Sequence, residues 1–355
     1  MSDPLDVARY IFVNDENELR SGWRVLVFFI CFIIVAALLT GLTKAFETLI
    51  PSIGSLRRQQ PVDLIVNNLT NLAAAVIASA ICARVLERRS LGSVGFRLHR
   101  GWLRDFALGS LMGAASLAIA VGIATGVGAL TFDVQTRELA PLVRGLIVVS
   151  LFFVIAGAFE ELIFRGFPFQ ALVHNLGGAR AVAITSLLFG LAHVSNPGAS
   201  AFSTINTILA GVWLGLAYLM TRSLWLATAL HWSWNFAMVF IFGLPVSGFT
   251  SLDQLAWLRS NVGEPLWVSG GSYGPEAGAA ATVALILSTL AIWRSGLFTA
   301  SEEMLIAIKH GKREPAFVSV IPGTQEPLES TADMHGSSES EIQAAMSEAQ
   351  GPCDG

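Results

Sequence analysis

Long apolar runs separated by short polar segments form most of the chain. Runs of about 17–25 apolar residues have the length at which an α-helix crosses the hydrocarbon layer of a bilayer. Within a bilayer a spanning segment must satisfy its own backbone hydrogen bonds, which favours helices. The pattern therefore predicts an all-α fold, a polytopic membrane helical bundle of about eight transmembrane helices. The predicted segments are residues 23–42, 64–86, 106–130, 142–163, 181–194, 202–220, 224–242 and 277–292.

Some segments differ from a plain apolar span. The fifth has only 14 residues, which is short for a span, so it either begins earlier or lies inside protein. The third is rich in glycine, which allows close helix packing, and the asparagines of the second predict a face that meets protein or water. The stretch 166–180 contains Pro168 and the Gly177-Gly178 pair, and we predict a broken, re-entrant connection there.

Composition supports a membrane protein and excludes several other classes. Hydrophobic residues make up 53% of the chain and charged residues only 14%, compared with about 25% charged residues in soluble domains. Its basic residues form no stripe suited to nucleic acid, so we expect no nucleic-acid partner. Cys31, Cys82 and Cys353 lack the spacing of a disulfide framework or a zinc knuckle. The residues before the first apolar run are acidic, unlike a cleavable signal peptide.

The distribution of positive charge predicts the orientation. With eight spans both termini lie on the same side, and 16 of the 22 Lys and Arg residues then fall on that side. The other six are Lys44, Arg57, Arg58, Arg137, Arg144 and Arg259. Loops rich in Lys and Arg remain in the cytoplasm, so we expect an integral protein of the plasma (inner) membrane with cytoplasmic termini.

Four regions follow from this pattern. Residues 1–98 hold the N-terminal membrane segments and a basic linker, and residues 99–245 form a helical core. Residues 246–297 comprise a loop and the last transmembrane helix. The remainder, 298–355, is a polar cytoplasmic tail that ends in a Glu-, Ser- and Gly-rich composition typical of disorder.

Three charged residues stand at the end of the fourth segment, after the uncharged run 145–159. In lipid such a charge costs about 2–3 kcal/mol or more, so ionisable residues there are functional candidates. Glu161 and Arg165 are four residues apart on one helix and can form an ion pair. Glu160 is turned about 100° from Glu161 and has no local partner, which suits a general base. The alternative is an acid that extends to the membrane edge.

Two histidines and an asparagine lie on other segments. His193 ends the fifth segment, where a histidine is also often a hydrogen-bonded core residue. His231 and Asn235 share one face of the seventh segment, and His231 lies about 12 Å from its cytoplasmic end at 1.5 Å per residue. Asn235 could instead join two helices, and Trp232 and Trp234 could be interfacial anchors. The depth of His231 agrees with that of Glu160 and Glu161, which predicts a shared polar site.

The three motifs Glu160-Glu161-x-x-x-Arg165, Phe189-x-x-x-His193 and His231-x-x-x-Asn235 resemble those of the CAAX-protease and bacteriocin-processing family, also called CPBP or Abi. Its members are intramembrane endopeptidases similar to the type II CAAX prenyl endopeptidase. The resemblance covers about residues 100–245, with the motifs in the same order and spacing.

The resemblance implies a proteolytic mechanism. In it Glu160 and His193 activate a water molecule, and His231 and Asn235 stabilise the oxyanion. Glu161 and Arg165 then orient the first glutamate. Glu160, His193 and His231 could also hold zinc with an open water position. No HExxH motif occurs, however, and a metal-free glutamate–histidine site fits these residues as well.

We therefore expect an intramembrane endopeptidase that hydrolyses a peptide or membrane-protein substrate near the cytoplasmic membrane face, in contact with membrane lipid. The alternative is a non-catalytic membrane scaffold, or a bacteriocin-immunity or regulatory protein, of the same fold. The intact set of polar residues argues against that alternative, and the lack of internal repeats argues against a secondary transporter.

Overall fold

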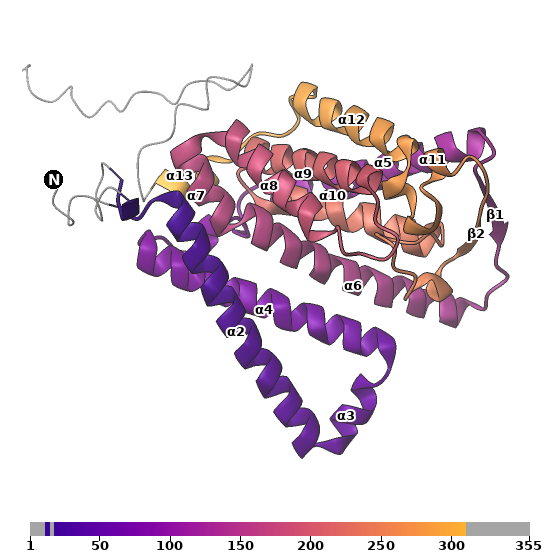
Figure 1. Cartoon of the computed structure of the whole chain (residues 1–355), viewed down its shortest axis with the longest axis horizontal. Helices are drawn as coiled ribbons and strands as arrows, with labels where there is room; N and C mark the ends of the chain where they lie inside the picture. The colour runs from indigo at the N-terminus through magenta and orange to yellow at the C-terminus, as the bar shows by residue number, and fades with distance from the viewer. Residues whose placement is uncertain (1–10, 15–17, 310–355) are drawn as a thin grey trace, which may run out of the picture. The chain divides into compact units, whose positions relative to one another are not determined.

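The computed structural model describes residues 11–14 and 18–309, which belong to one compact unit. Long apolar helices form at the predicted segments (Figure 1). Within the described residues, six are long and apolar enough to span a membrane: α2 (Ser21–Leu49), α4 (Gln60–Leu86), α5 (Trp102–Gly126), α6 (Leu139–Arg165) continued by α7 (Phe167–Leu176), α9 (Ala201–Thr221) and α10 (Leu224–Phe236) with the following π-helical turn (Ala237–Ile241).

Two shorter apolar helices occupy the remaining predicted segments. These are α8 (Gly178–Ala192) and α12 (Ala279–Arg294), with 15 and 16 residues. The all-α polytopic bundle is thus confirmed, and the protein is an integral membrane protein. The number of eight spans is not confirmed, because α8 and α12 are shorter than a typical span.

Short helices occur where the sequence predicted irregular chain. The helix α7 replaces the predicted broken connection, because Pro168 stands in its first turn, where a missing N–H leaves no hydrogen bond unmade. Within the predicted disordered tail, α13 (Glu302–Lys309) is helical, with Met304 buried, and residues 310–355 lie outside the described residues. The other short elements are α3 (Pro51–Arg57), α11 (Leu266–Ser269) and four 3-10 turns, Leu91–Val94, Asp253–Leu255, Gly271–Tyr273 and Pro275–Ala277.

A small sheet was not predicted. Strand β1 (Leu130–Val134) pairs with β2 (Leu258–Val262) in an antiparallel register that places Leu130 opposite Val262. β1 follows directly on the predicted third segment, and β2 lies in the polar loop between the seventh and eighth. The sheet therefore joins the end of α5 to the loop region after α10 (Figure 1).

The helix α10 lies inside the bundle, packed against α5, α6 and α9. In the most apolar 18 residues of α10 and its π-helical turn, 78% of the residues are buried, whereas the value for α2 is 6%. The apolar side chains of α2 therefore face outward, where lipid would lie. The close contact with α5 depends on Gly113, because a Cβ there would lie 2.2 Å from Ser233 Oγ and 2.4 Å from the Leu230 carbonyl oxygen. The bundle thus buries the helix that carries His231 and Asn235.

The N-terminal helices add a second layer to one side of the core. α2 packs on α4 and α7, and α4 packs on α6 (Figure 1). The buried guanidinium of Arg24 bonds the carboxylates of Glu18 at 2.7 Å and Glu87 at 3.1 Å, which fixes the base of α2 against the end of α4. This packing brings Asn68 of α4 to the edge of the cavity described next.

Candidate active site

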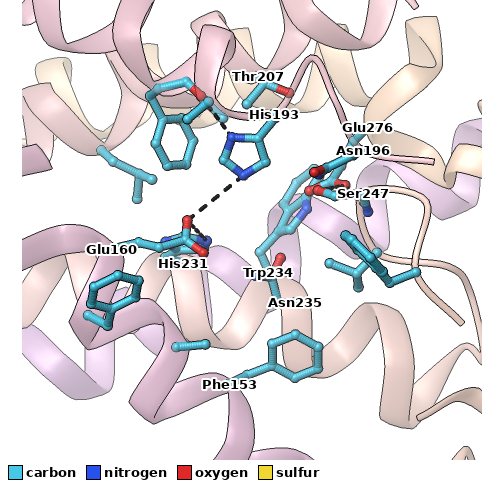
Figure 2. Close-up of a pocket in the computed structure, with 18 of the residues that line it drawn as sticks. Phe153, Glu160, His193, Asn196, Thr207, His231, Trp234, Asn235, Ser247 and Glu276 are labelled. Atoms are coloured by element: carbon cyan, nitrogen blue, oxygen red, sulfur yellow. Dashed lines mark hydrogen bonds and ion pairs between the residues drawn. The ribbon is translucent and has the colours of Figure 1, made fainter. Parts of the chain in front are cut away.

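A cavity of about 550 Å³ lies between the helices of the core (Figure 2). Apolar side chains of α6 and aromatic rings of the surrounding helices line one part of it. A second part is polar. The polar lining comprises Asn68, Glu160, His193, Asn196, Asn206, Thr207, His231, Asn235, Ser247, Ser251 and Glu276.

Glu160 extends from α6 into this cavity between two imidazole rings. Its Oε2 lies 3.9 Å from Nε2 of His193 and 3.9 Å from Nε2 of His231. Its side chain is 28% exposed, whereas that of the adjacent Glu161 is fully buried. The structure therefore brings together Glu160 of α6, His231 of α10 and His193 at the end of α8, as the motifs predicted (Figure 2).

Glu161 is the centre of a buried polar network on the other face of α6. Its Oε1 accepts hydrogen bonds from Arg165 at 3.2 Å and from Nδ1 of His231 at 2.9 Å. Arg165, also fully buried, donates to the Gly211 carbonyl of α9 at 3.1 Å and lies 4.5 Å from the ring centroid of Phe189. The predicted Glu161–Arg165 pair is present, and its contact with His231 connects α6 to α10.

His193 directly follows the last residue of α8. Its Nδ1 lies 2.7 Å from the Phe189 carbonyl oxygen. Because a carbonyl oxygen only accepts hydrogen bonds, Nδ1 carries the proton, and in the neutral ring Nε2 is an acceptor that points toward Glu160. The short fifth segment thus ends at the cavity, where Ala192 and His193 form part of the lining.

Asn235 lies one turn after His231 on α10 and also lines the cavity. The residue is 8% exposed, and its Oδ1 is buried without a hydrogen-bond partner among the described residues. The neighbouring Trp234 is 4% exposed and packs edge-on against Trp213, with ring centroids 5.9 Å apart. The possibility that Trp234 is an interfacial anchor was therefore wrong: this ring belongs to the core.

The arrangement does not match a metal centre. Among residues 11–14 and 18–309, no group of three or more His, Cys, Asp or Glu side chains is arranged to hold a metal ion, and this includes Glu160, His193 and His231. We therefore derive no step of the mechanism through zinc.

The sequence analysis missed the second carboxylate of the cavity, Glu276, which comes from the 3-10 turn before α12. It also missed Ser247 and Asn206, which contact Glu276. One signal was available, since Glu276 is the single acidic residue between Pro275 and the apolar run of the last segment.

The fold and the site define a membrane-embedded protein whose buried polar cavity brings glutamate, histidine and asparagine together. Residues 142–237, which include all six residues predicted from the motifs, match the family described as type II CAAX prenyl endopeptidase Rce1-like. This match supports a CAAX-type intramembrane protease at the level of the family. A comparison with curated proteins gave no significant match.

The buried network makes a prediction about stability. Arg165→Met leaves the Glu161 carboxylate without its guanidinium partner, and removing one member of a buried ion pair costs about 3–5 kcal/mol. Thermal unfolding of the protein in detergent measures the loss. Arg58→Met, at an exposed position, is the control and is expected to unfold like the wild type. In the double variant Glu161→Gln/Arg165→Met the loss is smaller than the sum of the two single losses, and additive losses would contradict the coupling.

Proposed function

We propose that this protein is an intramembrane endopeptidase in which Glu160 and His193 activate the hydrolytic water. The observation that carries the proposal is the position of Glu160 Oε2, 3.9 Å from Nε2 of both histidines within the cavity. At such a separation a water molecule can bridge the polar groups. A carboxylate and the unprotonated Nε2 of His193 both accept hydrogen bonds, so a bridging water donates one O–H group to each. The lone pairs of that water then point away from both residues.

The first chemical step adds this water to the peptide carbonyl. The water oxygen bonds to the carbonyl carbon as its proton passes to Glu160, and the carbonyl oxygen becomes an oxyanion. In the second step the C–N bond breaks and the proton moves from Glu160 to the leaving nitrogen. The products are a carboxylic acid and an amine, and Glu160 is again a carboxylate.

His231 and Asn235 stabilise the oxyanion in this proposal. The Asn235 amide can donate from Nδ2. His231 directs Nδ1 to Glu161, and in the protonated ring, which this proposal requires, it also donates from Nε2 into the cavity. The carboxylate of Glu161 is a partner for that positive charge, and Arg165 holds Glu161 in place. Donors fixed in advance around developing charge need no reorganisation during the reaction.

The proposed substrate is a peptide or a membrane protein that reaches the cavity from the membrane. The apolar part of the cavity, with Leu64, Phe153 and Phe159, suits apolar side chains. The family description points to prenylated CaaX sequences as one candidate class.

In the proposed orientation both termini lie at the cytoplasmic face, as the distribution of Lys and Arg favours. The end of α6 at Arg165 and the start of α10 at Leu224 lie at the same face. A single cysteine at Ser301, in a chain whose own cysteines are replaced by serine, is expected to resist an impermeant thiol reagent added from outside intact cells. A cysteine at Gln135, in the opposite loop, is the matched position and is expected to react. Labelling at Ser301 but not at Gln135 would reverse the orientation.

Glu160→Gln is expected to reduce cleavage of a quenched fluorescent peptide library by a factor of about 10²–10⁴, because the amide cannot accept the proton of the water. The assay uses purified protein in detergent. Glu302→Gln makes the same change at an exposed position of α13 and is expected to retain the wild-type rate. Equal cleavage by wild type and Glu160→Gln would rule out the assigned base.

Asn235→Ala is expected to lower kcat by about 10²–10³ with little change in KM, as for the loss of one oxyanion donor. The comparison variant is Asn68→Ala, which changes an amide on α4 at the edge of the same cavity. A rise in KM at constant kcat for Asn235→Ala would instead indicate a role in binding the ground state.

A further inference from the structure

The cavity has a second carboxylate, Glu276, at some distance along the lining from Glu160. Figure 2 shows Glu276 grouped with Asn196 and Ser247 on the side of the cavity away from Glu160. Its turn, Pro275–Ala277, precedes α12 and lies outside the family match, which ends at residue 237. Neither the motifs nor the proposed hydrolysis uses this group.

The carboxyl of Glu276 is held in a fixed position. Its Oε2 accepts hydrogen bonds from both the backbone N–H and the hydroxyl of Ser247, at 2.6 and 2.7 Å. Ser247 has a left-handed backbone with φ of 47°, which is uncommon for a residue other than glycine and persists where surrounding structure enforces it. Among the described residues, Oε1 has no hydrogen-bond partner and remains available to the cavity.

The main chain of Glu276 is anchored as well. Asn206 of α9 donates from Nδ2 to the carbonyl oxygens of Glu276 and Gly278, both at 3.0 Å, and its Oδ1 accepts from Thr282 at 2.7 Å. The loop packs closely, because a Cβ on Gly274 would lie 2.1 Å from the Pro245 carbonyl oxygen. Both ends of the side chain are therefore placed by contacts that do not involve the catalytic residues.

The charge of the lining indicates what this carboxylate can bind. Of the residues of the described chain that line the cavity, two are glutamates, two are histidines and none is lysine or arginine. Arg165 is fully buried behind Glu161 and does not reach the lining. A free peptide carboxylate would meet no permanent positive charge here, whereas an ammonium or guanidinium group would meet a fixed acceptor.

We propose that Glu276 is a specificity-determining residue that binds a positively charged group of the substrate, a lysine or arginine side chain or a free N-terminal ammonium. The inference rests on the proposed endopeptidase function and adds a substrate class to it. The cationic group would be held through Glu276 Oε1, while the apolar residues of the peptide lie along the other part of the cavity.

The proposal includes a pH dependence. Burial raises the pKa of the Glu276 carboxyl, while the hydrogen bonds from Ser247 and the nearby His193 and His231 oppose that rise. Tyr273 also faces this carboxyl. An ordinary glutamate has a pKa of about 4.3. Because the pKa of Glu276 is raised, its carboxylate becomes protonated and loses its negative charge at a higher pH than an ordinary glutamate does. The preference for a cationic peptide is therefore expected to weaken as the pH is lowered, and Glu276→Gln is expected to remove this dependence.

The test measures peptide binding separately from turnover. The peptides are fluorescent, acetylated and amidated, and they carry either lysine or the uncharged norleucine at each position in turn. Fluorescence anisotropy measures their affinity for the full-length Glu160→Gln variant in detergent. At one position the lysine peptide is expected to bind about tenfold more tightly, equivalent to about 1.4 kcal/mol. A norleucine peptide with a free amino terminus distinguishes an N-terminal ammonium from a side chain.

Adding Glu276→Gln is expected to bring the lysine-to-norleucine ratio to about one, whereas Glu264→Gln, an acid outside the cavity lining, leaves the ratio unchanged. If Glu276→Gln does not fold, Ser247→Ala removes the hydroxyl donor to the carboxyl, leaving only the backbone N–H, and is expected to reduce the same ratio. No lysine preference at any position, or a preference that survives Glu276→Gln, would overturn the inference. Failure of the proposed function has a different result, namely no peptide cleavage by the wild type or equal cleavage by Glu160→Gln.

Discussion

The site depends on one buried carboxylate, Glu161, and its contacts with the guanidinium of Arg165 and the imidazole of His231. Glu161 Oε1 accepts from Arg165 of its own helix and from His231 of α10. Arg165 also bonds the Gly211 carbonyl of α9. A carboxylate without access to water needs such partners, since its desolvation costs several kcal/mol. The network therefore fixes the relative positions of α6, α9 and α10, on which the distances around Glu160 depend.

Two adjacent acids can differ in role because of helix geometry. A step of 100° directs Glu161 toward α9 and α10 and Glu160 toward the cavity. Glu161 is fully buried and paired, while Glu160 is 28% exposed and lies at 3.9 Å from each histidine. Arg165 forms its ion pair with Glu161 and does not line the cavity into which Glu160 extends. The same two residues in a soluble helix would both be hydrated and nearly equivalent.

The sequence allowed prediction where the bilayer restricts the choice of residues. Charged and imidazole side chains are rare in apolar segments, so Glu160, His193, His231 and Asn235 stood out, and the Glu161–Arg165 pair followed from its local spacing. The bond between Glu161 and His231 joins residues 70 positions apart and could not be predicted from spacing. The sheet of β1 and β2 and the position of Glu276 lie in polar connections, where that restriction does not apply.

The length of α8 shows where a length rule gives an ambiguous answer. A hydrophobic run of 14 residues is too short for a span under the assumption that a helix must reach both membrane faces. The structure relaxes that assumption, because α8 ends at Ala192, where the chain borders the cavity, and His193 satisfies the Phe189 carbonyl there. A helix that ends within a bilayer leaves carbonyl groups to be bonded, which is tolerated where the chain borders a polar cavity. The shortness of the segment and the polar residue at its end therefore have the same cause: the helix ends at the cavity, which places His193 beside Glu160.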